Sequence, residues 1–410
     1  MSCPPFLSRR RPARMAAALA AALLTMFGCQ GETTAPTSPE IPPTLATTGT
    51  ATLTFRQLSL GNGHTCGVTT DDMTWCWGDG VLGDGTFDQS STPIAVTGGL
   101  HVAQVTSGGP NCLLTTDGQA YCWGFNWEGE LGDGTTESVD LSPVAVAGDR
   151  RYTQLHAGFT HACALTASGA AFCWGQNAYG ELGTGASTGP QDCSGVPCSR
   201  APVRAARGHT FVQIKVGSEH TCGLDADHRF WCWGNNEFGQ LGDGTTTNRL
   251  NPVEVVGSHA FRQVSVGAFH TCGVTADGTA WCWGMDRDGR VGAGSTSARR
   301  RQPFKVRGGL VFSGVSAGVD HTCGVTTDKV AYCWGNNEYA QLGDGTTTER
   351  HTPSRVTGSR RWGTVIAGWR HSCGVTGAGR AFCWGDNEWG QLGDGTNDDH
   401  PTPVAVAGPM

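Results

Sequence analysis

The 410-residue chain has a formal charge of −7, and loss of residues 1–28, which contain four arginines and no acid, would bring it to −11. A body this acidic is a poor partner for nucleic acid or for an anionic membrane surface. Its 62 glycines, together with the lack of an apolar stretch of helical period after residue 29, favour an all-β protein rich in turns.

The first 29 residues have the features of an export signal. Four arginines at positions 9, 10, 11 and 14 precede an apolar run at 15–28, which is too short to span a bilayer. Cys29 follows Gly28 directly, and the segment resembles the signal of bacterial lipoproteins, in which this cysteine is lipidated. We expect residues 1–29 to be a signal peptide and Cys29 to carry the lipid. Simple secretion is the alternative.

Residues 30–50 are rich in proline, threonine and serine and contain almost no bulky apolar side chain. This composition is typical of an extended, flexible tether. We therefore expect a tether at 30–50 and a folded body at 51–410, located in the cell envelope and attached to the membrane through the N-terminal lipid only.

One short unit recurs seven times in the body. The copy at 270–284 is predicted to form a strand, an Asp277-Gly278 turn and a second strand, with nine residues between Cys272 and Cys282. Because the turn falls midway, the two cysteines lie opposite each other, at a spacing of about 4.5 Å between Cα atoms that is near disulfide reach. The other copies lie at 64–78, 111–124, 161–175, 220–234, 321–335 and 371–385.

The cysteine count supports an oxidising compartment. Of 18 cysteines, 14 form the hairpin pairs and two more lie close together in an insertion, leaving only Cys3 and Cys29. One pair per repeat does not supply the tetrahedral ligand cluster of a zinc site. The predicted disulfides are Cys66–Cys76, Cys112–Cys122, Cys163–Cys173, Cys193–Cys198, Cys222–Cys232, Cys272–Cys282, Cys323–Cys333 and Cys373–Cys383.

Each repeat contains four candidate strands, which in the fifth copy lie at 261–266, 270–275, 279–283 and 303–306. Four antiparallel strands per unit, repeated seven times at intervals of about fifty residues, predict a β-propeller with seven four-stranded blades. Closure into a ring protects sheet edges that would otherwise pair with other chains. The basic run Arg299-Arg300-Arg301 is interpreted as a solvated loop.

A loop motif sharpens this prediction. The sequence NEFGQLGDGT at 236–245 recurs at 337–346 and 387–396, and more loosely at 126–135 and 177–185. With G-x-x-H-T-C, C-W-G-x-N and a closing P-V-x-V, it resembles the regulator of chromosome condensation repeat over residues 55–408. The resemblance implies a seven-bladed propeller used as an interaction platform, here of a bacterial, secreted or lipoprotein type. The eukaryotic founder of that family is a guanine-nucleotide exchange factor on chromatin, and a secreted bacterial relative inhibits β-lactamases.

Two sets of repeated residues are interpreted as structural. Histidines before the first cysteine of six repeats are expected to bond neighbouring backbone, and the tryptophans of C-W-G are expected to fill the space between blades. No phosphate-binding loop, nucleophile elbow or carboxylate pair stands out, so no catalytic residue, cofactor or metal site is predicted. The repeated residues are His64, His161, His220, His270, His321 and His371, and Trp77, Trp123, Trp174, Trp233, Trp283, Trp334 and Trp384.

Departures from the repeat point to function. The first repeat lacks three residues between Gly78 and Leu82, the second has Pro110-Asn111 where others have histidine, and the third contains an insertion at 187–200. The residues just before each repeated histidine also vary, and they should line one rim of the propeller, with the Cys193–Cys198 loop beside them. Aromatic and arginine side chains on a rim are typical of protein contacts. The candidate partner-binding residues are Phe159, Glu219, Phe269, Asp320, Trp369 and Arg370; an idle surface position is the alternative for each.

Three functions remain open from the sequence. The first is a monomeric cell-envelope platform that binds an extracytoplasmic protein or glycan. The second is an envelope hydrolase or lyase, which would require about three converging titratable side chains in the central channel. The third is nucleotide exchange by family analogy, which the export signal disfavours because a small GTPase would lie across the membrane.

Overall fold

The computed structural model describes residues 53–409, and over this range the chain forms 29 β-strands and no helix. No helix among these residues could therefore cross a membrane. The predicted signal peptide, the lipidated Cys29 and the tether at 30–50 lie outside the described residues.

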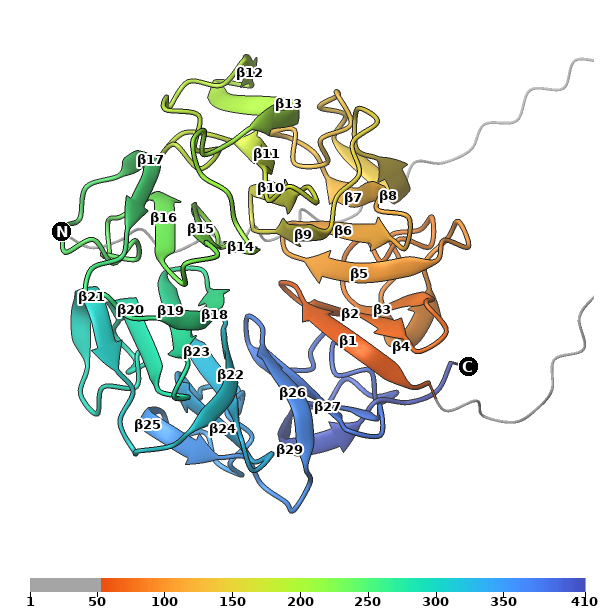
Figure 1. Ribbon diagram of the computed structural model, residues 1–410. Coiled ribbons are helices and arrows are strands. Elements are labelled where there is room, and N and C mark those ends of the chain that lie inside the picture. Colours follow the sequence, from red (N-terminus) through yellow and green to blue (C-terminus); the bar gives the residue numbers. More distant parts are fainter. Residues whose placement is uncertain (1–52, 410) are drawn as a thin grey trace, which may run out of the picture. The chain divides into compact units, whose positions relative to one another are not determined.

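Seven antiparallel sheets are arranged around a ring, each built from one continuous stretch of chain (Figure 1). Within each blade the first strand is the innermost and the strands pair in sequence order, except in blade 3, where β11 pairs with β13 and β12 lies outside β13. The prediction of a seven-bladed propeller with four-stranded antiparallel blades is confirmed. The inner strands are β1 (Phe55–Leu60), β5 (Val102–Ser107), β9 (Gln154–Ala157), β14 (Gln213–Val216), β18 (Phe261–Val266), β22 (Phe312–Ala317) and β26 (Trp362–Ala367).

The second and third strands of each blade form the cysteine hairpin. The second strands are β2 (His64–Thr69), β6 (Pro110–Thr115), β10 (His161–Leu165), β15 (His220–Leu224), β19 (His270–Thr275), β23 (His321–Thr326) and β27 (His371–Thr376). The third strands are β3 (Thr74–Gly78), β7 (Ala120–Phe125), β11 (Ala171–Gln176), β16 (Phe230–Gly234), β20 (Ala280–Asp286), β24 (Ala331–Gly335) and β28 (Ala381–Gly385).

The outer strand of each blade follows a long loop. These strands are β4 (Ser90–Ala95), β8 (Val139–Ala145), β13 (Val196–Arg204), β17 (Arg249–Glu254), β21 (Ser297–Lys305), β25 (Arg350–Arg355) and β29 (His400–Ala405). In blade 5 the outer strand begins at Ser297, six residues before the predicted start, and it contains the arginine run. The solvated-loop interpretation was wrong, because Arg300 lies opposite Gly284 in the sheet and forms an ion pair of 2.5 Å with the buried Asp286.

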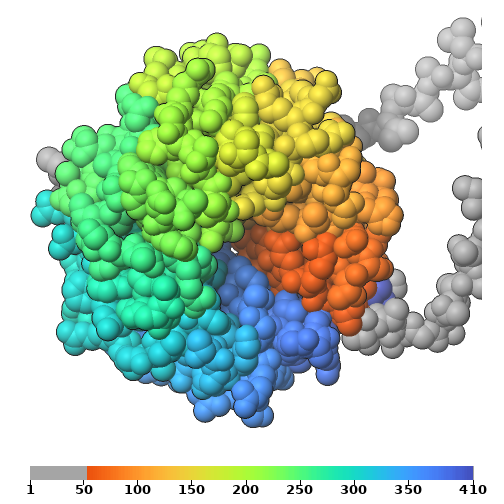
Figure 2. Space-filling model, in the orientation of Figure 1, coloured from red at the N-terminus to blue at the C-terminus, as the bar shows by residue number. Residues whose placement is uncertain are grey.

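The ring closes without exchange of a strand between its ends. β1 contacts both β26 and β27, and the Phe55 N–H donates to the carbonyl of Gly379 at 2.7 Å. The indole of Trp77 donates across the same junction to the carbonyl of Gln391 at 3.0 Å. Side-chain packing and hydrogen bonds therefore join blade 7 to blade 1 in the way that they join the other blades. In Figure 2 the colours, which follow the sequence, run once around the ring.

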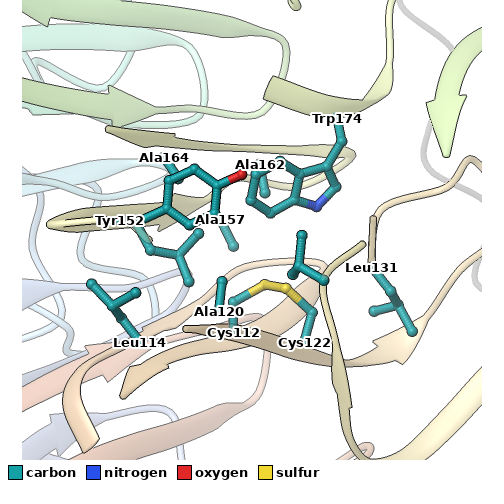
Figure 3. Close-up of a cluster of buried hydrophobic side chains, with 12 residues drawn as sticks. Cys112, Leu114, Ala120, Cys122, Leu131, Tyr152, Ala157, Ala162, Ala164 and Trp174 are labelled. Carbon is teal, nitrogen blue, oxygen red and sulfur yellow. A yellow bond between two sulfur atoms is a disulfide. The ribbon is translucent and has the colours of Figure 1, made fainter. Parts of the chain in front are cut away.

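Each junction between blades encloses its own hydrophobic core. At the junction of blades 2 and 3, the Cys112–Cys122 disulfide and Leu131 face Ala157 and Trp174 (Figure 3). The tryptophans of the seven C-W-G motifs are all fully buried. Each of these cores is formed by side chains from two neighbouring blades, so no blade can bury its apolar surface alone.

All eight cysteine pairs that the spacing predicted are disulfides in the structure. In the hairpins the two cysteines lie directly opposite, with Cα atoms 4.1 Å apart in Cys272–Cys282. This is the short spacing of a non-hydrogen-bonded antiparallel pair.

The insertion of the third repeat extends the outer edge of blade 3. It contributes β12 (Gln191–Cys193), which pairs with β13 and becomes a fifth strand at the periphery of the ring (Figure 1). The expectation that the Cys193–Cys198 loop lies beside the rim residues was wrong. The insertion supplies both β12 and the first residues of β13, so it forms a hairpin that extends the outer edge of the blade.

Candidate functional site

One end of the propeller carries the turns between first and second strands together with the loops between third and fourth strands. In blade 1 the two meet directly, since the Asp79 N–H donates to the carbonyl of Gly63 at 2.9 Å. We call this end the loop face. Every residue proposed from the sequence for partner binding belongs to it.

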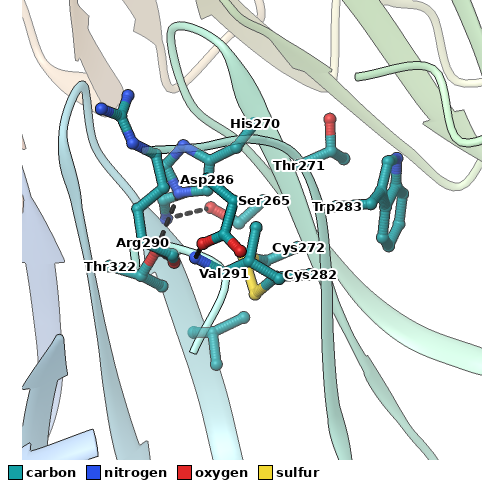
Figure 4. Close-up of a disulfide and its surroundings, with 12 residues drawn as sticks. Ser265, His270, Thr271, Cys272, Cys282, Trp283, Asp286, Arg290, Val291 and Thr322 are labelled. Atoms are coloured by element: carbon teal, nitrogen blue, oxygen red, sulfur yellow. Dashed lines mark hydrogen bonds between the residues drawn. A yellow bond between two sulfur atoms is a disulfide. The ribbon is translucent and has the colours of Figure 1, made fainter. Parts of the chain in front are cut away.

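The repeated histidines bind the next blade. The Nε2 atom of each one lies 2.7 to 2.9 Å from a hydroxyl or amide oxygen on the second strand of the following blade, as His270 and Thr322 show in Figure 4. The six pairs are His64–Asn111, His161–Thr221, His220–Thr271, His270–Thr322, His321–Ser372 and His371–Thr65.

The hydrogen bonds of the Thr322 hydroxyl determine which ring nitrogen of His270 carries the proton. Thr322 donates its single proton to the carbonyl of Arg290 at 2.8 Å, so it must accept from Nε2–H of His270. The Nδ1 atom then has no proton, and the ring rests against Gly267, where a Cβ would come 3.0 Å from Nδ1. Burial lowers the pKa of His161, His220, His321 and His371 to about 3. The histidines are structural, but the prediction that they bond backbone was wrong: they link blades through side chains.

The junction of blades 2 and 3 lacks this link. Pro110 replaces the histidine, and Ala162 replaces the threonine that would accept from it. The two turns keep the backbone contact that other junctions also have: the Gly109 N–H donates to the carbonyl of Gly158 at 2.8 Å, as the Val319 N–H donates to the carbonyl of Gly368 at 3.0 Å. A Cβ on Gly108 would lie 1.9 Å from that carbonyl oxygen, so the contact requires glycine.

A second repeated position differs between blades in charge. The glutamine of G-Q-L-G is buried, and the Gln240 amide accepts from the Phe238 N–H and donates to the oxygen of Asn235 at 3.0 Å. Blades 2 and 3 have Glu130 and Glu181 at this position, which are 6 % and 0 % exposed. Each accepts one backbone N–H, but neither has an ion-pair partner among residues 53–409. Burial raises the pKa of both carboxyl groups to about 7.

The two glutamates differ in their surroundings. The Oε1 atom of Glu181 is sealed in the interior without a hydrogen bond, and the Oε1 atom of the nearby Gln176 is also unpaired. Glu130, by contrast, lines an open pocket on the loop face.

This pocket has a volume of about 440 Å³ and lies between the turns and loops of blades 1, 2 and 3. It exists because the blade 1 loop lacks three residues, and the short segment Asp79-Gly80-Val81 stands where the other blades place a full turn. Phe125, Trp127 and Phe159 line it, and they are 41 %, 59 % and 44 % exposed. The Phe125 and Trp127 rings stack with centroids 4.8 Å apart.

The sequence-predicted rim residues separate into two groups. Phe159 is exposed and reaches the pocket, whereas the other five are half-buried and contact neighbours on the loop face. Glu219 accepts from Asn235 at 2.9 Å, Asp320 pairs with Arg290 at 2.9 Å, Phe269 packs on Phe238, and Arg370 lies over Tyr339 and Trp369.

The loop between the third and fourth strands of blade 2 was not identified from the sequence as part of a binding site. The other blades with a full loop have Glu or Ala followed by an aromatic residue after the repeated asparagine, or Arg-Asp in blade 5, whereas blade 2 has Trp127 followed by Glu128. This inverted order places the tryptophan outward and the carboxylate inward, and it was the available signal for the pocket.

The central channel is a second cavity, of about 590 Å³. Its titratable lining consists of His156, Lys215 and Lys329, without a carboxylate among the described lining residues. The His156 Nδ1 accepts from the Val216 N–H of the next blade at 3.2 Å, and Gln57 likewise clamps the backbone of Val105. His156 and Gln57 are therefore engaged in joining blades.

Comparison with known proteins shows a consistent relationship. The E3 ubiquitin-protein ligase HERC2 of Homo sapiens is 29 % identical over 315 residues, which cover 72 % of this chain and 6 % of that protein. The ultraviolet-B receptor UVR8 of Arabidopsis thaliana is 29 % identical over 206 residues, or 48 % of this chain and 45 % of the receptor. The chain thus spans less than half the length of these relatives.

Among solved structures, Prp20p from Saccharomyces cerevisiae, whose structure was described with its binding to Gsp1p and histones, matches with a TM-score of 0.72 at 21 % identity. The match covers 83 % of this chain and 87 % of Prp20p. The model of the RCC1-like domain matches residues 24–311, and two models of the regulator of chromosome condensation (RCC1) repeat match 312–341, 330–375 and 378–410. The chain belongs to the RCC1-like family.

Proposed function

We propose that this protein is an exported, lipid-anchored binding platform that holds a protein of the cell envelope on the loop face of blades 1–3. The observation that carries the proposal is the pocket between these blades, with three exposed aromatic rings around it. Large aromatic side chains on a rigid scaffold are the residues that most often anchor protein contacts.

The other candidate functions have less support. An enzyme in the channel would need an acid and a base in reach of one substrate, and of the titratable lining residues His156, Lys215 and Lys329 the first already accepts the Val216 N–H of the next blade. Nucleotide exchange would rest on the likeness of fold to Prp20p alone.

A cross-linking experiment tests the platform. A photoreactive phenylalanine derivative at position 125 of the full chain, which lines the pocket and keeps Trp127 in place, should capture one protein partner when it is activated in the native envelope. The matched control is position 311, because Val311 is 48 % exposed and contacts the hairpin turn at Gly278, on the opposite end of the propeller. Equal capture from both positions, or capture from 311 alone, would contradict the proposal. Labelling of a glycan without protein would contradict the choice of partner.

The envelope location rests on the export signal and on the eight disulfides, which persist in oxidising compartments. Cys29→Ser should remove the lipid and release the folded protein into the soluble periplasmic or extracellular fraction. Fractionation of cells and an immunoblot measure this. Retention of the variant in the membrane fraction would show that Cys29 is not the anchor.

A further inference from the structure

The same repeat position carries a buried cation in blade 5 and a buried anion in blade 2. Arg290 is 2 % exposed and is neutralised by Asp288 and by Asp320, whose carboxylate lies 2.9 Å from the guanidinium. Glu130 is 6 % exposed, and no lysine, arginine or histidine forms an ion pair with it among residues 53–409. Buried charges in proteins are normally paired, so Glu130 lacks the counterpart that Arg290 has.

The unpaired carboxylate opens to the outside. One oxygen of Glu130 accepts from the Glu128 N–H at 2.7 Å, and no hydrogen bond from the described chain reaches the other oxygen. The Oε2 atom of Glu128 is also buried without a partner, and Asp79 lies on the opposite side of the pocket. The pocket is therefore lined by three acidic residues and by no lysine or arginine.

Aromatic rings complete the surroundings. Trp127 stacks on Phe125, and Phe159 lines the pocket from blade 3. A cation above an aromatic face is attracted by the negative π surface, and a planar guanidinium stacks there especially well. The volume of about 440 Å³ is at the lower end of the range for ligand pockets, which suits one long side chain rather than an extended peptide.

We propose that the pocket between blades 1, 2 and 3 receives a lysine or arginine side chain of the protein partner, with Glu130 and Glu128 as its counter-charges and Trp127 as its stacking surface. The inference rests on the proposed function and adds the chemistry by which the partner is recognised. A metal ion is a poorer occupant, because no group of three potential ligands converges anywhere in the described chain.

The test uses the full chain and the tripeptide acetyl-Gly-Arg-Gly-amide, together with its lysine counterpart. Binding is followed through the indole N–H resonance of Trp127, which is assigned by its loss in Trp127→Phe. At about pH 8, above the pKa of about 7 of Glu130, both peptides should shift this resonance in a saturable manner. Glu130→Gln should weaken binding by about tenfold or more. The variant should fold, since glutamine is the native residue at this position in blades 4, 6 and 7.

Glu181→Gln is the matched control, because it makes the same change at the same repeat position in blade 3, away from the pocket. It should leave peptide binding within about twofold of wild type. Equal binding of acetyl-Gly-Gln-Gly-amide, or an equal loss in both variants, would overturn the proposal.

The cross-linking result separates this inference from the proposed function. Partner capture from position 125 without any shift by the two basic peptides would leave the platform intact and reject the cation pocket. Capture should also map to a partner segment that contains a lysine or arginine, and a captured segment without a basic residue would contradict the inference.

Discussion

The blades from β14 to β29 and those from β1 to β13 come from the same repeat but differ in how they use its polar positions. In blades 4 and 6, Gln240 and Gln341 hydrogen-bond an asparagine of the same loop at 3.0 and 2.8 Å. In blades 2 and 3 the corresponding Glu130 and Glu181 lack that bond, and the junction between these blades lacks the histidine link. Blades 4 and 6 keep the polar contacts of the repeat, whereas the altered loops and turns of blades 1, 2 and 3 form the pocket.

The largest effect that we expect is on the free energy of unfolding at acidic pH. The folded pKa of four ring histidines is about 3, below the unfolded value of 6.5, so the unfolded chain binds more protons between these values. Their contribution is complete above pH 6.5 and is lost as pH falls toward 3, at up to about 1.4 kcal/mol per histidine per pH unit.

Glu130 and Glu181 act in the opposite sense. Their folded pKa of about 7 lies above the unfolded value of 4.5, so their contribution is complete below pH 4.5 and is lost as pH rises through 7. The stability that the two glutamates add as pH falls offsets only part of the stability that the four histidines lose. Urea unfolding should therefore show a net loss of stability between about pH 6 and pH 4. A flat profile in this window would contradict the neutral-histidine ring.

Removal of one ring histidine should have the next largest effect. His270→Ala leaves a cavity and deprives Thr322 of its donor, so it should lower the free energy of unfolding by about 3 kcal/mol. Denaturant unfolding measures this, with the exposed His101→Ala as control. A change of less than about 0.5 kcal/mol would mean that the histidine links contribute little.

An exchange at the glutamine position should give smaller and opposite changes. Glu181→Gln supplies an amide to the unpaired oxygen of Gln176, as Gln240 does to Asn235, and should stabilise the protein by about 1 kcal/mol at pH 8. Gln240→Glu should destabilise it by about 2 kcal/mol at the same pH, because a buried carboxylate would face an amide oxygen. The advantage of Glu181→Gln should shrink as pH falls toward 4.5. Equal destabilisation by both changes would show that the two blades do not differ here.

The fold could be predicted because its determinants are local. The turn between Cys272 and Cys282, the alternation of their strands and the seven copies all lie within about fifty residues of sequence. The partner of His270 could not be found in this way, since Thr322 belongs to the next repeat. The sequence nevertheless contains a sign of this contact: where Pro110 replaces the histidine of one repeat, Ala162 replaces the threonine of the next.

The pocket was harder to predict, because it results from residues that are missing. The shorter loop of blade 1 was visible in the sequence, but its effect on blades 2 and 3 depends on how three loops meet in space. Phe159 was identified from the variation of its turn, whereas the loop that contains Trp127 was used only to recognise the repeat.

The most direct test of the division between scaffold and pocket is a paired measurement of unfolding and partner capture for Trp127→Ala and His270→Ala. Trp127→Ala should change the free energy of unfolding by less than about 1 kcal/mol, since the ring is 59 % exposed, and should reduce partner capture by about thirtyfold. Capture for Trp127→Ala is measured from a photoreactive residue at Phe125. His270→Ala should unfold more easily and, while folded, capture the partner normally. Normal capture by Trp127→Ala, with loss of capture by folded His270→Ala, would contradict the account.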